Sequence, residues 1–271
     1  MVLYQHKLKW KVMRKKDLEI KELLDKEVAC RSGDCELSYE KPDPLLVASR
    51  FDDEYKILLC ALFGYGKASL IVKFLDSLNF DLLDEKEELI KKELQNYYYR
   101  FQNSDDVINI FIAFRRLRKE NSLNDLFVKA YKKESSILEG IDNLINEIQK
   151  INPRNTQGYY FFVSKPFKRD KQGKIKEIGN APYKRWNMFL RWMVRDEQLD
   201  LGLWKGVDKK DLILPLDTHT FQVSKKLGLL DRKSYDLKSA LEITNKLKEF
   251  NPKDPIVYDF SLYRIGQEKI I

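Results

Sequence analysis

Apolar side chains recur at helical spacing along most of the chain, and this pattern predicts about ten helices with almost no strand. The segment 52–63 is apolar on most faces, which favours a position at the centre of a core. A proline at position 153 ends the central helical series, because proline cannot continue a helix. The predicted helices cover residues 52–63, 67–78, 84–95, 105–119, 121–132, 136–151, 184–194, 217–227, 236–250 and 256–266.

The remaining segments follow other patterns. Residues 1–27 form a basic, helical lead-in, and residues 28–50 are predicted to be irregular because glycine and proline interrupt them. The tract 159–163 is short, aromatic and β-prone, so it is the one strand-like segment. A basic loop over 165–176 follows it, and residues 196–213 form a connector.

The chain has 271 residues, long enough for one large domain or two small ones sharing a core. Hydrophobic residues make up 43% of it and charged residues 34%, a composition typical of a globular protein rather than a disordered one. No apolar run approaches the roughly 20 residues that span a bilayer, and the N-terminus lacks the apolar core of a secretory signal. We therefore expect a cytoplasmic protein with no membrane partner.

The chain has three cysteines, Cys30, Cys35 and Cys60, and two histidines, His6 and His219. The odd cysteine count argues against a disulfide framework. No second cysteine pair completes a zinc site, and one chain with three cysteines cannot hold a four-cysteine iron–sulfur cluster. We expect no metal, no iron–sulfur cluster and no other cofactor.

Positive charge is concentrated in one segment. The chain has a net charge of +8, whereas residues 154–195 alone carry eleven Lys and Arg against two acidic residues. Such a concentration is the electrostatic footprint expected of a protein that binds a phosphate backbone, although a solvated basic loop without a partner has the same composition. The residues predicted to contact DNA are Lys165, Lys168, Arg169, Lys171, Lys174, Lys176 and Arg185.

Asp217 follows an apolar loop and precedes a predicted helix. A carboxylate in this position accepts hydrogen bonds from free N–H groups of the first turn and faces the positive end of the helix. Asp217 is therefore predicted to be an N-cap, and that role alone explains an aspartate here.

The sixteen residues 214–229 resemble a catalytic motif of the helix-hairpin-helix (HhH-GPD) DNA glycosylases, of the endonuclease III and 8-oxoguanine glycosylase type. The motif places an apolar residue before Asp-Thr-His, then a valine, then Leu-Gly-Leu. The matching residues in this chain are Leu216, Asp217, Thr218, His219, Val223, Leu227, Gly228 and Leu229.

The resemblance implies an all-α fold in which two helical subdomains flank a cleft. The larger subdomain is expected to cover residues 51–211, with the hairpin and Lys184. In the superfamily the N-terminal helix packs with the C-terminal part, so the smaller subdomain is expected to be discontinuous, with residues 1–50 plus 212–271 and Asp217.

The resemblance also assigns chemistry to two residues. Asp217 would stabilise the positive charge that develops on the sugar as the base departs. Lys184, which opens an apolar helix, would attack C1′ and form a Schiff base. That step needs a neutral amine, which burial or the neighbouring Arg185, Arg191 and Arg195 would favour. The alternative role for Lys184 is a phosphate contact.

The hairpin departs from the family pattern. Its stretch, residues 178–184, keeps one glycine and has a proline where a second glycine is expected. Lys184 and Asp217 are 33 residues apart, a long spacing that is similar to the archaeal 8-oxoguanine glycosylase branch. The block 185–195, together with 51–75, 97–127 and the rest of 184–266, also resembles a bacterial family of unknown function.

In the archaeal branch, an acid and an aromatic residue four positions apart on the last helix line the base pocket. Asp259 and Tyr263 have that spacing here, although the roles of a cap and a core aromatic would also explain them. We expect a monomeric glycosylase that removes an oxidised purine, such as 8-oxoguanine, from double-stranded DNA with AP lyase action. The alternatives are a monofunctional glycosylase and a nucleic-acid-binding protein that keeps the fold without catalysis.

Overall fold

The computed structural model describes residues 13–31, 36–197 and 199–269. Within these ranges the chain is helical and contains no β-strand, so the prediction of an all-α fold is confirmed. The first helices are α1 (Lys15–Cys30), α2 (Leu45–Ala48), α3 (Glu54–Leu62), α4 (Ala68–Ser77), η2 (Phe80–Asp84), α5 (Glu87–Leu94), α6 (Ser104–Glu120), α7 (Leu123–Glu134) and α8 (Ile137–Ile151). The later ones are α9 (Gln157–Val163), α10 (Lys184–Val194), η3 (Lys209–Asp211), α11 (Thr218–Leu227), α12 (Leu237–Phe250), η4 (Pro255–Tyr258) and α13 (Asp259–Gln267).

Polar side chains set the starts of several of these helices. Asn103 and Asp106 form a reciprocal capping box at α6, where each side chain accepts a hydrogen bond from the other residue's backbone. The carboxylate of Asp53 caps α3, and that of Asp236 caps α12. These caps satisfy backbone N–H groups that have no partner within the helix, which explains why the predicted starts agree closely with the observed ones.

Two segments differ from the sequence prediction. The predicted lead-in lies partly outside the described residues, which begin at position 13, and the helix there extends beyond residue 27 to Cys30. The predicted irregular segment 28–50 contains the short helix α2, and Cys35 lies outside the described residues.

The prediction of a strand-like tract at 159–163 is wrong, because these residues form helix α9. The hydroxyl of Thr156 accepts a hydrogen bond from the backbone N–H of Tyr159 at 3.2 Å and starts the helix. Tyr159 and Phe162, three positions apart, are both fully buried, and the Phe162 ring lies 4.5 Å from that of Phe63. A cap and core packing at helical spacing outweigh the β-propensity of aromatic residues.

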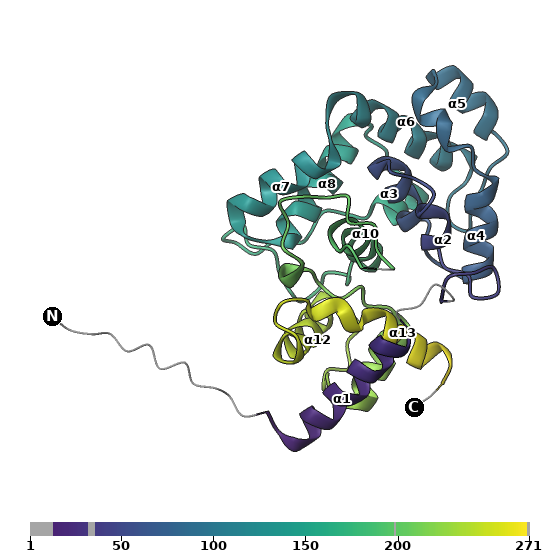
Figure 1. Cartoon of the computed structure of the whole chain (residues 1–271). Helices are drawn as coiled ribbons and strands as arrows, with labels where there is room; N and C mark the ends of the chain where they lie inside the picture. Colours follow the sequence, from purple (N-terminus) through teal and green to yellow (C-terminus); the bar gives the residue numbers. More distant parts are fainter. Residues whose placement is uncertain (1–12, 32–35, 198, 270–271) are drawn as a thin grey trace.

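The central element is α3, which packs against α10 and has a buried side chain at almost every position. Helices α2 to α8 lie on one side of α10, and α1, α12 and α13 lie on the other (Figure 1). The first and last described helices meet, since α1 packs against η4 and α13, and Arg31 forms two hydrogen bonds with the carboxylate of Glu268. The division into subdomains 51–211 and 1–50 plus 212–271 stays a prediction.

No helix in the described part of the chain is long and apolar enough to cross a membrane.

Helices α11 and α13 are in close contact at Gly266. A Cβ atom at this position would lie 2.9 Å from the Cβ of His219 and 3.0 Å from a methyl group of Val223, with the His219 carbonyl oxygen at 3.2 Å. Because one of these neighbours is backbone, the contact cannot be relieved by moving a side chain alone. The spacing between the two helices therefore depends on a residue without a side chain.

We expect Gly266→Ala to destabilise the protein by about 1–3 kcal/mol, since the added methyl group overpacks the contact between α11 and α13. Chemical denaturation measures this loss. Gln222→Ala, on the exposed face of α11, is the matched control and should change the free energy of unfolding by less than about 0.5 kcal/mol. Equal stability of the two variants would contradict the close contact.

Candidate active site

A cavity of about 850 Å³ lies between the start of α10, the loop 164–183, the end of α3, and helices α11 and α13. This volume is within the range of roughly 300–1,000 Å³ typical of small-molecule sites. Of the residues singled out in the sequence, those that line the cavity are Lys184, Asp217, Asp259, Tyr263, Lys165, Lys168 and Arg185. The remaining four, Arg169, Lys171, Lys174 and Lys176, do not line it.

Lys184 is the first residue of α10 and is half-buried. The residue before it, Tyr183, has a φ of 48° in the left-handed region, so the chain turns sharply into the helix. No carboxylate of the described residues lies within ion-pair distance of the Lys184 amine. An unpaired amine on the wall of a cavity is available to a ligand.

Asp217 caps α11, and its Oδ1 accepts a hydrogen bond from the backbone N–H of Thr220 at 2.8 Å. The predicted N-cap role is confirmed. The side chain is half-buried and also lines the cavity. Burial, together with the negative charge of Asp217, raises the pKa of the nearby Tyr235, whose hydroxyl donates to the Leu216 carbonyl at 2.7 Å. The capping hydrogen bond thus holds the Asp217 side chain in a fixed orientation at the cavity wall.

Asp259 is buried and accepts a hydrogen bond from Nη1 of Arg191 at 2.6 Å. Burial raises the pKa of Asp259 and the ion pair with Arg191 opposes the shift, while the charge of Asp217 raises this pKa further and that of Lys184 lowers it. The charges of Asp217 and Lys184, which belong to different helices, therefore both influence the pKa of Asp259. Burial likewise raises the pKa of Tyr263 to about 12. The assignment of Asp259 and Tyr263 to a base pocket stays a prediction.

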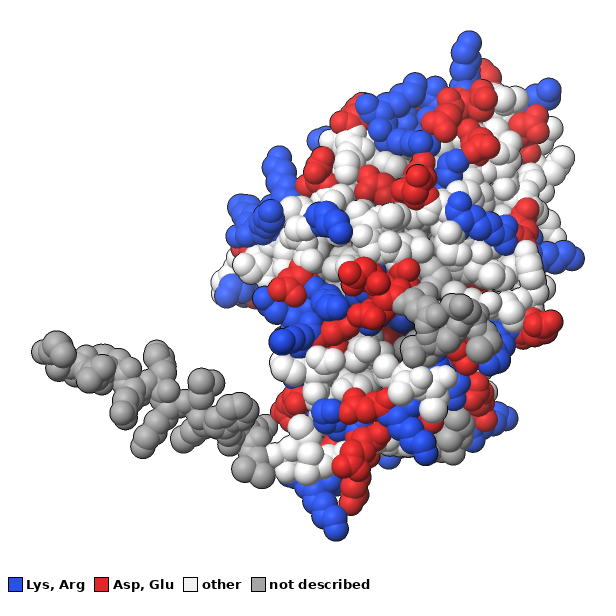
Figure 2. Space-filling model, viewed as in Figure 1, with Lys and Arg blue, Asp and Glu red and all other residues white. Residues whose placement is uncertain are grey.

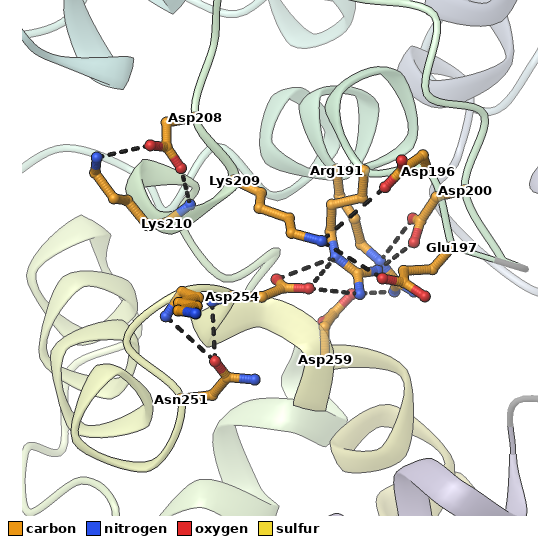
Figure 3. Close-up of polar contacts among 12 residues, drawn as sticks. Arg191, Asp196, Glu197, Asp200, Asp208, Lys209, Lys210, Asn251, Asp254 and Asp259 are labelled. Carbon is orange, nitrogen blue, oxygen red and sulfur yellow. Dashed lines mark hydrogen bonds and ion pairs between the residues drawn. The ribbon is translucent and has the colours of Figure 1, made fainter.

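Behind the cavity, two arginines and three aspartates form a buried network of ion pairs (Figure 3). Arg191 lies between Asp259 and Asp200, with its Nε 3.1 Å from Asp200 Oδ1. Arg195 contacts Asp200 and forms a bidentate pair with Asp254, at 2.9–3.1 Å. The side chains of Asp200 and Arg195 are 0% and 3% exposed. The network joins α10 to the loop after it and to the C-terminal helices.

This network changes the interpretation of the basic segment. Arg191 and Arg195 add to its formal charge, but three aspartates neutralise them inside the protein. Arg169 is exposed, but it pairs with Glu139 and Asp142. The face of the molecule shown in Figure 2 carries interspersed acidic and basic side chains. Four of the residues predicted to contact DNA have side chains without an ion-pair partner among the described residues. They are the loop lysines Lys168, Lys171, Lys174 and Lys176.

Arg185 connects three elements. Its guanidinium donates to the backbone carbonyls of Leu62 and Phe161 and lies 5.1 Å and 5.0 Å from the ring centroids of Tyr65 and Phe161. Arg185 is half-buried, and because it is desolvated there without a carboxylate partner, its pKa is lowered to about 10. Arg185 was predicted to contact DNA. In the structure its guanidinium instead links the start of α10 to the ends of α3 and α9.

The loop 164–183 joins α9 to α10. Asn180 is buried and fixes the loop, donating to the carbonyls of Lys168 and Lys176 and accepting from the N–H of Lys168. Ser164 begins the loop with φ 78° and ψ 160°, a conformation that is nearly restricted to glycine. Strain of this kind is concentrated at functional sites. Sequence reasoning missed both residues, because neither has a local signature.

No group of three or more His, Cys, Asp and Glu side chains in the described part of the chain is arranged to hold a metal ion. Cys30 is exposed and Cys60 is buried in α3, where burial raises the pKa of its thiol.

Comparison with known proteins identifies a family for the chain. The family described as "protein of unknown function (DUF2400)" matches residues 43–268, which is most of the chain and includes every residue of the cavity. The chain therefore belongs to this family. No curated protein and no solved structure gave a match.

We expect Arg195→Ala to destabilise the protein by about 3–5 kcal/mol, because it leaves Asp200 and Asp254 buried with one cation for three carboxylates. The control is Arg232→Ala, which removes a partly exposed ion pair with Asp236 and should cost no more than about 1 kcal/mol. Chemical denaturation compares the two variants. A similar small loss in both would contradict a stabilising role for the buried network.

Asp200 makes stability depend on pH. An unfolded aspartate titrates near about 3.9, whereas burial raises the pKa of Asp200 to about 6. The folded protein therefore binds a proton at Asp200 more tightly than the unfolded chain does. The stability gained from this proton is present below about pH 4 and is lost as pH rises through about 6. Between pH 4 and 7, the wild type should lose about 1–3 kcal/mol relative to Asp200→Asn. If the denaturation midpoints of wild type and Asp200→Asn differ by the same amount at every pH, the raised pKa of Asp200 is contradicted.

Proposed function

We propose that this chain is a DNA glycosylase of the helix-hairpin-helix superfamily, which acts as a monomer on a damaged base flipped out of double-stranded DNA. The observation that carries the proposal is the position of Lys184 and Asp217. They are 33 residues apart and belong to different helices, yet both line one cavity. The motif 214–229 supports the same assignment.

The cavity has the features that a flipped base requires. Aromatic side chains that are not fully buried line it, including Tyr160, Phe161 and Tyr263, and rings of this kind stack on the faces of a base. A few polar groups, among them the buried carboxyl of Asp259, are available to contact its edge. An oxidised purine such as 8-oxoguanine is the substrate that we propose.

Asp217 and Lys184 would carry out successive parts of the reaction. As the bond between C1′ and the base breaks, the base leaves with the bonding electrons, and the Asp217 carboxylate stabilises the positive charge on the sugar. The neutral amine of Lys184 then forms a bond to C1′, and loss of a proton and opening of the sugar ring give a Schiff base. Elimination of the 3′ phosphate from this intermediate cleaves the strand.

A specific observation favours a second candidate, a monofunctional glycosylase in which water attacks C1′ and Lys184 contacts phosphate. The arginines that neighbour Lys184 in sequence are engaged elsewhere: Arg191 and Arg195 pair with aspartates, and Arg185 contacts carbonyl groups. The cationic environment that would favour a neutral amine is therefore weaker than the sequence indicates.

Borohydride trapping on duplexes carrying different damaged bases tests the proposal. Wild type should release a base and form a covalent adduct, and Lys184→Gln should form no adduct. Asp217→Asn should slow base release by about 100-fold or more, since the charge is lost. Asparagine is as good an N-cap as aspartate, so this variant should stay folded.

Lys165→Gln is the matched control, because Lys165 also lines the cavity but has its amine 5.4 Å from the Tyr160 ring. It should keep the adduct. Base release without an adduct in the wild type would support the monofunctional candidate. Salt-sensitive binding with neither product across a broad lesion panel would rule out an enzyme and leave a nucleic-acid-binding protein.

A further inference from the structure

A tight turn projects two exposed side chains beside the cavity. Tyr99 and Gln102 pair through reciprocal backbone hydrogen bonds of 2.9 Å, so Arg100 and Phe101 form the tip of a two-residue turn. Arg100 has a φ of 52°, a position that glycine normally occupies in such turns. Positions of this kind are concentrated at functional sites.

The ring of Phe101 belongs to an aromatic cluster at the cavity wall. Its centroid lies 4.6 Å from that of Phe161, and its plane is within 12° of the plane of Tyr65. Tyr65 and Phe161 both line the cavity. Phe101 and Phe161 are nevertheless 53% and 39% exposed, which is unusual for phenylalanines that contact other rings. We call Tyr65, Phe101 and Phe161 the aromatic platform.

Cations flank this platform. The Arg100 guanidinium lies 5.8 Å from the centroids of both Tyr65 and Phe101. On the far side of Phe161, the chain enters the loop that carries Lys165 and Lys168, both on the cavity wall. Aromatic faces next to a row of positive charges are the combination that binds unpaired bases and their phosphates.

We propose that the aromatic platform stacks an unpaired nucleobase next to the base held in the cavity, so that the protein prefers single-stranded or locally opened nucleic acid. This inference rests on the proposed nucleic-acid function but does not require base excision. A nucleic-acid strand fits the surface better than an apolar protein segment, because Arg100 and Arg185 both lie over rings of the platform. No carboxylate of the described residues pairs with Arg100.

Stacking can be separated from charge by comparing two single strands of equal length. One is a labelled oligothymidylate of about 12 nucleotides, and the other is an abasic oligomer with the same phosphates but no bases. At one fixed salt concentration, wild type should bind the oligothymidylate at least about fivefold more tightly, the lower range of one base–aromatic stack. Phe101→Ala and Phe101→Leu should lose this preference, and Phe101→Trp should keep it.

Tyr98→Ala is the matched control. Tyr98 is 74% exposed and lies in the same segment, but it makes no ring contact within the described residues and should leave the preference unchanged. Equal affinity of wild type for the two strands would overturn the proposal and would be the result expected if the platform binds a protein. An unchanged preference in Phe101→Ala would also overturn it. Neither result depends on base release, so the glycosylase proposal is tested independently.

Discussion

The ion pairs of Arg191 and Arg195 with three aspartates set the geometry on which the cavity depends. Lys184 is carried by α10, whereas Asp217 and Asp259 are carried by the C-terminal helices, and this network is a direct polar connection between the two groups of elements. Burying charges is costly, so the partners must stay aligned for the network to be tolerated. The same requirement keeps α10 aligned with Asp254 and Asp259.

Two further contacts complete this arrangement from opposite sides. Gly266 lets α13 approach α11, which holds Asp217. Arg185 joins the first turn of α10 to the ends of α3 and α9 through two backbone carbonyls. The cavity wall is therefore supported by the close contact at Gly266, by the half-buried Arg185 and by the buried network of ion pairs. The loop 164–183, which begins at the strained Ser164, is the part of the wall with the most exposed charge.

The helices were predictable from the sequence because local signals agreed with the fold. Capping residues such as Asp217 and Asn103 precede apolar residues at helical spacing, and both signals specify the same starts. The tract 159–163 was misassigned because its aromatic residues favour strands locally, while the core contacts of Phe162 come from residues far away in the chain. The charged residues could not be assigned either. Whether an arginine such as Arg191 faces solvent or Asp259, 68 positions away, is decided only by the fold.

The double role of Asp217 has a consequence for how the family diverges. Its carboxylate caps α11 as well as lining the cavity, so selection for a stable helix preserves an acceptor side chain there whether or not the protein acts on a substrate. Lys184 has no such structural duty among the residues described. Under the mechanism that we propose, members of the family that keep Asp or Asn at position 217 but have lost the lysine at position 184 would be those that form no Schiff base.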